Sequence, residues 1–390
     1  MTTRRDFLKA SIAMTAGSQT PGLNKRLEAK PGSSALHAAP TTAPEWRNQQ
    51  PEMRYRRLGR TGFMISEIVC GGDPISPTNN THVDLAIEMG LNYLDTAPGY
   101  HDGQSELGYA PVIQGSKRDR IFLTTKLTPF TGARITAYQK IFKTFSADDQ
   151  AAILRQANED IERRGVSLPN YLGNYFDGQY RDAMSSAIAN VMEKKFGEKI
   201  DRRATYIETI FNSVEDSLRR LKTDHVDLLM CPHGATSPAE AQVPEIFEAY
   251  EKLRQQGKVR FLGVTAHSDP AGVLKAAMES GVYSAAMVAC NIVNRQYMEP
   301  VVEEAHRRDF GVIAMKVARC VHDLDEPKRP MPERADLLNS LVPGDMPLPV
   351  KAYRFMLNNP NLSAVISCMW NDQMVRENLA LVRQGPPATA

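Results

Sequence analysis

The sequence predicts a (β/α)8 barrel, or TIM barrel, preceded by a β-hairpin. From Met53 onward, eight strand-like runs alternate with helical runs, and eight β–α units in one chain favour a closed barrel. The strand-like runs are continuously apolar, as expected of parallel strands covered on both faces. An open doubly wound sheet is the alternative. It calls for a G-x-G-x-x-G turn after the first strand, which the segment CGGDPI does not supply.

The elements follow in order along the chain. A hairpin is expected over residues 53–66, with Arg60-Thr61-Gly62 at its turn. The eight strands are expected at residues 67–75, 92–97, 121–127, 226–231, 259–265, 284–292, 311–318 and 362–369. The helices are expected at residues 82–90, 105–115, 209–221, 243–257, 272–280, 298–308, 350–359 and 371–383. The third of these helices places its large apolar residues on one face, as a helix packed on a barrel should.

Two segments exceed a minimal barrel. The first, residues 128–205 after strand three, holds helical runs at 146–165 and 181–197, with the aromatic stretch PNYLGNYFDGQY between them. The second, residues 319–348, is a long Pro-rich loop. Both follow the carboxyl ends of strands, where active sites of this fold lie, so we expect a lid or a substrate wall. The alternative is an insertion that packs on the barrel or mediates oligomerisation.

Composition narrows the classes of function. With 47 basic and 45 acidic residues, the chain gives no indication of a nucleic-acid partner. No apolar run reaches the roughly eighteen residues of a membrane span, and the histidines lack metal-ligand spacing, so no metal site is expected. The cysteines form no CxxC pair, and four of the five lie in apolar or strand-like runs, which favours burial over disulfide or metal use. The five are Cys70, Cys231, Cys290, Cys320 and Cys368.

The N-terminal segment differs from the rest of the chain. TRRDFLK at Thr3–Lys9, followed by the short and weakly apolar stretch SIAMTAG, resembles a bacterial twin-arginine export signal. Residues from 10 to about 50 are rich in Ala, Pro, Ser and Thr and are expected to be linker. We therefore expect a signal and linker over residues 1–50, a barrel domain over residues 53–385, and a periplasmic protein exported by the twin-arginine machinery. A disordered basic tail is the alternative.

Four polar side chains are expected at the carboxyl ends of predicted strands. Asp95 and Tyr100 lie in DTAPGY, Lys126 closes IFLTTK, and His233 closes VDLLMCPH. Reducing a carbonyl requires a proton for the developing alkoxide, and a free tyrosine, with a pKa of about 10, exchanges one poorly at neutral pH. A nearby ammonium lowers the pKa of the phenol, and a carboxylate holds the ammonium. The set predicts Tyr100 as general acid or base, Lys126 and Asp95 as its tuning groups, and His233 as the residue that positions the substrate oxygen.

The chain resembles the aldo-keto reductase family over nearly all of residues 53–385, in a series of segments that follow the family's order. The segments are MRYRRLGRTGFMISEIVCGG, NYLDTAPGYHDGQSELG, IFLTTKL, SLRRLKTDHVDLL, GKVRFLGVTAH, GVIAMK and MVRENL. The resemblance implies a (β/α)8 barrel, a nicotinamide cofactor bound without a Rossmann unit, and an Asp–Tyr–Lys–His tetrad. Asp95, Tyr100 and Lys126 match the family motif residue by residue.

His233 departs from the family's spacing. The family places its histidine five residues after the acid that opens the strand, whereas His233 follows Asp227 by six, with Pro232 inserted. One extra residue turns a side chain to the other face of a strand. A bulge at Cys231-Pro232 would return His233 to the site, and a second-shell or surface histidine is the alternative.

The resemblance also implies cofactor contacts, with departures from the family pattern. Contacts are expected from Thr265, His267, Asn291, Lys316, Ser367, Met369, Glu377 and Asn378. Lys316 is expected to face the nicotinamide or the phosphates, and Glu377 and Asn378 the adenine side. The Lys, Ser and Arg that grip the 2′-phosphate of NADP in the family are replaced here by Cys368, Met369 and Met374. The expected cofactor is NADP by resemblance, with NAD as the alternative because the cationic clamp is missing.

The leading expectation is a nicotinamide-dependent oxidoreductase that interconverts the carbonyl and alcohol forms of a small molecule, with sugars among the candidates. Two alternatives stay open. A cofactor held tightly could serve internal redox, as in an epimerase or lyase. The barrel could instead be a non-catalytic binding module.

Overall fold

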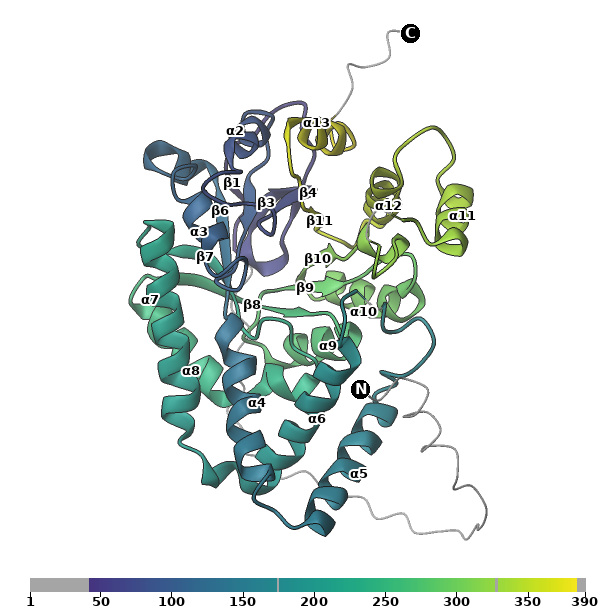
Figure 1. Ribbon diagram of the computed structural model, residues 1–390. Coiled ribbons are helices and arrows are strands. Elements are labelled where there is room, and N and C mark those ends of the chain that lie inside the picture. Colours follow the sequence, from purple (N-terminus) through teal and green to yellow (C-terminus); the bar gives the residue numbers. More distant parts are fainter. Residues whose placement is uncertain (1–41, 174, 327–328, 384–390) are drawn as a thin grey trace. The chain divides into compact units, whose positions relative to one another are not determined.

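A computed structural model describes residues 42–173, 175–326 and 329–383, all within the compact unit Leu36–Ala390. In this part of the chain eight parallel strands close into a barrel, with neighbours in the order β10-β11-β4-β5-β6-β7-β8-β9 (Figure 1). The strands are β4 (Ile68–Gly71), β5 (Tyr93–Asp95), β6 (Phe122–Lys126), β7 (Val226–Met230), β8 (Val259–Ala266), β9 (Ala285–Ala289), β10 (Gly311–Met315) and β11 (Ala364–Ser367). The predicted barrel is confirmed. The predicted export signal at Thr3–Lys9 lies outside the described residues and stays a prediction.

Helices follow the strands along the chain and surround the barrel (Figure 1). They are α2 (Thr81–Glu88), α3 (Gln104–Tyr109), α7 (Thr209–Leu221), α8 (Pro244–Gln255), α9 (Pro270–Ser280), α10 (Arg295–Arg307), α12 (Leu348–Leu357) and α13 (Asp372–Ala380). In the described residues, no helix is both long enough and apolar enough to span a membrane. Four of the five cysteines are buried, as predicted, and Cys368 is exposed.

Successive side chains along the strands point alternately into the barrel and toward the helices, so the apolar residues form an inner core and an outer core. On β6, Phe122 belongs to the cluster inside the barrel, whereas Leu123 belongs to the cluster beneath the helices. On β5, Tyr93 is inside and Leu94 outside in the same way. Because side chains alternate along a strand, a residue two or four positions after an inner residue also points inward. Asp95 and Lys126 therefore point into the barrel at its carboxyl end.

The predicted hairpin closes the amino-terminal end of the barrel. Its strands, β2 (Tyr55–Arg57) and β3 (Phe63–Ser66), pair antiparallel. Between them the chain turns and reaches Gly62 with a φ of 78°, a left-handed conformation that suits glycine. Phe63 stacks on Phe122, the first residue of β6, with ring centroids 4.3 Å apart. The hairpin therefore covers the inner core at the amino-terminal end of the barrel.

The predicted linker ends earlier than residue 50. Glu45–Trp46 form a short strand, β1, which pairs with β3 in parallel. The next residue, Arg47, forms an ion pair with the buried Asp227 at 3.0 Å. This side-chain contact, which composition does not indicate, fixes residues 45–47 to the barrel.

An insertion of three helices lies between β6 and α7 (Figure 1). They are α4 (Thr128–Phe142), α5 (Ala147–Arg163) and α6 (Gln179–Phe196), followed by a π-helical turn over Arg203–Glu208. The predicted helical runs correspond to α5 and α6. Between α5 and α6, Tyr171 and Tyr175 of the aromatic stretch contact the barrel through hydrogen bonds with Asp269 and Asn291.

Two helices were missed by sequence reasoning. They are α4 and, in the segment predicted as a Pro-rich loop, α11 (Pro332–Leu341). The buried face of α4 consists of Phe130, Arg134 and Tyr138, so an arginine interrupts its apolar pattern. Proline in the first turn was the available signal in both helices, because its missing N–H and fixed φ suit that position.

Asp269 anchors the insertion to the barrel. Its buried carboxylate accepts hydrogen bonds from Arg164 Nη1 at 2.6 Å and from Tyr171 Oη at 2.5 Å. It also caps α9 by accepting from Gly272 N at 3.2 Å. The Asp269 carboxylate therefore joins two positions of the insertion, Arg164 and Tyr171, to the first turn of α9.

Replacing Asp269 by Ala is expected to destabilise the protein by about 3–5 kcal/mol, because the nearly buried Arg164 loses its main counter-charge. Denaturant unfolding followed by circular dichroism measures the change. The matched control is Asp160→Ala, which removes the more exposed partner of the same arginine and should cost less. Equal losses in the two variants would contradict the anchoring role of Asp269.

Candidate active site

Asp95, Tyr100 and Lys126 meet at the carboxyl end of the barrel. Lys126 Nζ donates hydrogen bonds to Asp95 Oδ2 at 2.6 Å, Thr96 O at 2.9 Å and Tyr100 Oη at 2.9 Å. An ammonium has three hydrogens, so all of them are engaged and the phenol oxygen accepts one. The hydrogen of the Tyr100 phenol therefore points away from Lys126 and is free to be donated to another group.

Burial controls the protonation of these groups. It raises the pKa of Asp95 and lowers that of Lys126, while the attraction between their charges opposes both shifts. Burial, with the Asp95 charge adding to it, raises the pKa of Tyr100 well above its ordinary value. The prediction that Lys126 gives Tyr100 a lowered pKa is wrong in net direction, because burial and the Asp95 charge raise the pKa of the phenol. Tyr100 is a protonated phenol at neutral pH and can act as a proton donor.

His233 reaches the site from an irregular segment after β7. Regular pairing of β7 with β8 ends at Met230 and resumes at Ala235, so four residues lie opposite two. The two extra residues on this side form a bulge, as predicted, and the Cys231–Pro232 peptide bond is cis. The ring of His233 lies edge-on to that of Tyr100, with centroids 6.0 Å apart. The structure therefore brings all four predicted catalytic residues together.

The imidazole of His233 is neutral at neutral pH. Burial lowers its pKa well below 6.5, and the charges of Lys126 and Lys316 lower it further. Its Nδ1 lies 2.9 Å from Thr128 Oγ1, the side chain that begins α4. A neutral ring has one N–H donor and one acceptor nitrogen, so His233 can donate a single hydrogen bond to a substrate.

The predicted cofactor residues divide into two groups. His267, Lys316 and Glu377 are partly accessible to solvent. The others are buried, namely Thr265, Asn291, Ser367, Met369 and Asn378. Buried polar groups in proteins are hydrogen-bonded, and the polar members of the second group have protein partners.

Two of the buried residues support neighbouring segments. Thr265 Oγ1 accepts a hydrogen bond from Gly234 N at 2.7 Å, which holds the backbone directly after His233. Asn291 Nδ2 donates to Tyr175 Oη, in the aromatic stretch of the insertion, at 2.7 Å. Both side chains are therefore engaged in holding protein segments around the site.

The carboxyl-terminal residues behave in the same way. Asn378 Nδ2 donates to Ser367 Oγ at 2.8 Å and joins α13 to β11. The side chain of Met369 is fully buried in the outer core, and its predicted cofactor contact stays a prediction. Cys368 and Met374, at two positions where the resemblance implies a clamp for the 2′-phosphate, are exposed.

Comparison with known proteins decides the family. A sequence model of the aldo/keto reductase family matches residues 76–384. The chain belongs to the aldo/keto reductase family. It is 26% identical over 348 residues to the uncharacterized oxidoreductase YqkF of Bacillus subtilis, and the match spans 84% of this chain and 90% of that protein. The protein is therefore an NAD(P)-dependent oxidoreductase.

Solved structures of the family share the fold of this aldo/keto reductase. The holo form of AKR11C1 from Bacillus halodurans superimposes with a TM-score of 0.56 at 21% identity, covering 86% of this chain and 93% of that one. An aldo/keto reductase from Klebsiella pneumoniae in complex with NADP and acetate superimposes with a TM-score of 0.50 at 16% identity, covering 85% and 90%. At these identities the likeness concerns the fold alone.

The insertion places further residues at the site of this aldo/keto reductase. Phe176 lies edge-on to His267, with ring centroids 5.7 Å apart. Gln179 Nε2 donates to the His267 carbonyl oxygen at 3.2 Å. Sequence reasoning did not assign these residues, and the aromatic richness of PNYLGNYFDGQY was the signal that pointed to them. Phe176 and Gln179 therefore lie beside a predicted site residue, and the role of the insertion as a substrate wall stays a prediction.

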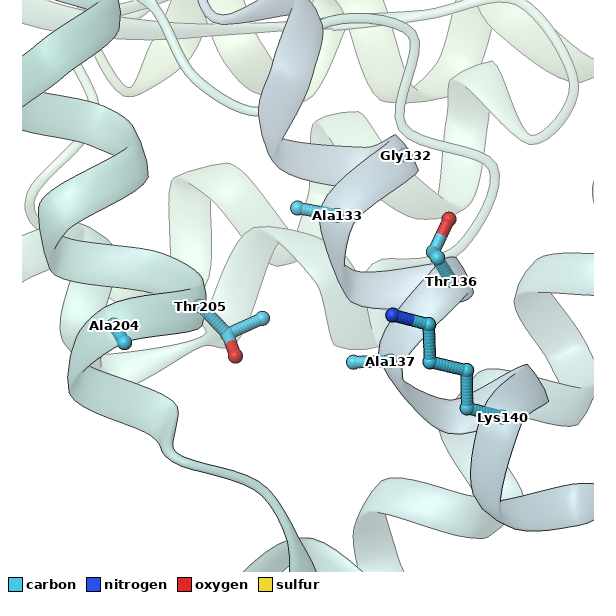
Figure 2. A pocket seen from close by; sticks show the side chains of 7 residues that line it. All are labelled: Gly132, Ala133, Thr136, Ala137, Lys140, Ala204 and Thr205. Atoms are coloured by element: carbon cyan, nitrogen blue, oxygen red, sulfur yellow. The ribbon is translucent and has the colours of Figure 1, made fainter.

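An open surface pocket of about 400 Å³ lies elsewhere, between α4 and the π-helical turn (Figure 2). Its lining consists of Gly132, Ala133, Thr136, Ala137, Lys140, Ala204 and Thr205. None of the four predicted catalytic residues borders it. This pocket is therefore separate from the candidate active site.

Proposed function

We propose that this aldo/keto reductase reduces the carbonyl group of a small molecule and oxidises the corresponding alcohol, with Tyr100 as general acid and base. The main support for this proposal is the set of three hydrogen bonds that Lys126 donates. Because Lys126 Nζ donates to Tyr100 Oη at 2.9 Å, the phenol must direct its own hydrogen elsewhere. The oxygen of a substrate carbonyl can accept that hydrogen.

In reduction, the substrate oxygen accepts hydrogen bonds from Tyr100 and His233. As negative charge develops on that oxygen, Tyr100 transfers its proton to it and is left as a phenolate. Lys126 then stabilises the phenolate through a hydrogen bond and its positive charge, and Asp95 holds the ammonium in place at 2.6 Å. In alcohol oxidation the phenolate takes the proton back.

A bound nicotinamide dinucleotide supplies or accepts the hydride. We propose NADP(H), as in the Klebsiella pneumoniae complex. The residues present suit an anionic dinucleotide. Lys316 is partly accessible, has no salt-bridge partner among the described residues, and is close enough to His233 and His267 to lower the pKa of both. Lys316 would hold a phosphate group of the cofactor.

Titration of the purified protein with NADPH and with NADH, followed by intrinsic fluorescence, tests this proposal. NADPH should bind and support reduction of simple aldehydes. Lys316→Met should weaken binding about tenfold through the loss of one charge-assisted hydrogen bond. The control Lys275→Met, at an exposed position on α9, should bind as the wild type does. Failure to bind either dinucleotide would contradict the proposal.

A further inference from the structure

Thr128 joins the two segments that carry the substrate-facing donors. Its Oγ1 lies 2.9 Å from His233 Nδ1 and accepts a hydrogen bond from Gly99 N at 3.2 Å. Gly99 directly precedes Tyr100, and Thr128 is the first residue of α4. One hydroxyl group therefore lies between the Tyr100 segment and the His233 ring.

The donors and acceptors at Thr128 favour one position for the proton of the imidazole. A hydroxyl has one hydrogen and two lone pairs, and Gly99 N–H can only donate, so it occupies a lone pair. Within the described residues, His233 Nδ1 is the remaining hydrogen-bond partner of Thr128 Oγ1. Donation of the hydroxyl hydrogen to Nδ1 is the arrangement that also gives this hydrogen a protein acceptor among the described residues. In that arrangement Nδ1 carries no proton, and the proton of the neutral ring is on Nε2.

The arrangement is closely packed. A Cβ atom at residue 99 would come within 2.7 Å of Thr128 Cγ2 and 3.0 Å of Thr128 Oγ1, so the approach of Thr128 requires glycine there. In the backbone directly after His233, Gly234 N donates a hydrogen bond to Thr265 Oγ1 at 2.7 Å. Two threonines thus hold His233, one through its ring and the other through the backbone that follows it.

We propose that Thr128 is a positioning residue that fixes His233 as the Nε2–H tautomer. With Nδ1 engaged by Thr128, the donor of the ring is Nε2–H, and the phenol of Tyr100 is the second free donor. Two donors and no acceptor select a group with two lone pairs on one atom, such as the oxygen of an aldehyde or ketone, and disfavour an ammonium group. The role of Thr128 in catalysis rests on the proposed function, whereas the tautomer of His233 can be tested without it.

Long-range ¹H–¹⁵N spectra of the histidine rings in the full-length protein test the tautomer directly, with His233→Gln to assign the signal. The wild type should show Nε2–H and an accepting Nδ1. Thr128→Val should move the Nδ1 resonance toward that of a free imine nitrogen, and Thr128→Ser should restore it. A protonated Nδ1 in the wild type, or an unchanged spectrum in Thr128→Val, would overturn the proposal. Should Thr128→Val not fold, the wild-type spectrum still decides between the tautomers.

Kinetics test the consequence for catalysis. Thr128→Val should lower kcat/KM for carbonyl reduction roughly 10- to 100-fold, as loss of a group that orients a histidine does. Thr128→Ser should retain most activity, and Thr136→Val, at an exposed position on α4, should match the wild type. Wild-type kinetics in Thr128→Val would overturn the positioning role. If Tyr100→Phe turns over like the wild type, the proposed function fails, and the spectra still report on Thr128.

Discussion

Replacing Tyr100 by Phe is expected to lower kcat for carbonyl reduction by about 10²- to 10⁴-fold, the usual contribution of a general acid. The variant keeps the ring but loses the only proton that the arrangement around Lys126 leaves free for a substrate oxygen. Steady-state reduction of an aldehyde with NADPH measures the effect. Dinucleotide binding should be unchanged, whereas stability should fall by about 1–3 kcal/mol, because one hydrogen of the buried Lys126 ammonium loses its acceptor.

The matched control is Tyr250→Phe. Its hydroxyl donates to Arg260 O at 3.1 Å, away from the four catalytic candidates, so turnover should stay at the wild-type level. Because the pKa of Tyr100 is raised, the phenol keeps its proton and the wild-type rate of reduction should be level through neutral pH. Turnover of Tyr100→Phe at the wild-type rate would rule out the assigned acid.

Replacing Lys126 by Met is expected to abolish most turnover and also to destabilise the fold by about 3–5 kcal/mol. Lys126 and Asp95 are almost completely buried and paired at 2.6 Å, so the single change leaves the Asp95 carboxyl without its counter-charge. Guanidinium unfolding at neutral pH measures the stability, and NADPH consumption measures turnover in the folded fraction.

The double variant Asp95→Leu/Lys126→Met separates the two effects. Removing both charges at once avoids an unpaired buried carboxylate, so stability should recover substantially. Turnover should not recover, because nothing then stabilises the Tyr100 phenolate. A single Lys126→Met variant that is as stable as the wild type would contradict the buried ion pair.

The barrel and three of the four catalytic candidates could be predicted from sequence because their signals are local. Continuous apolar runs mark the strands, and the polar residues Asp95 and Lys126 end two of them. Alternation along each strand then points both side chains inward. Tyr100 follows Asp95 in the same short segment. Helices α4 and α11 escaped prediction because their apolar stripes are weak and one buried position of α4 is Arg134.

Only the tertiary structure decided the protonation and the placement of the remaining groups. The raised pKa of Tyr100 results from burial among residues distant in sequence. His233 depends on how β7 pairs with β8, and its ring is held by Thr128, which lies 105 residues away in the chain. Asn291 is engaged by Tyr175 of the insertion, 116 residues away.

The sequence by itself therefore determined the barrel, the family resemblance, and the presence of a phenol, an amine and a carboxylate at neighbouring strand ends. Local periodicity and spacing suffice for these. The tertiary structure decided which hydrogen each group can donate, which predicted cofactor residues are accessible, and what the insertion contacts. Hydrogen-bond partners and desolvation arise from segments that meet only on folding, so no local pattern in the chain encodes them.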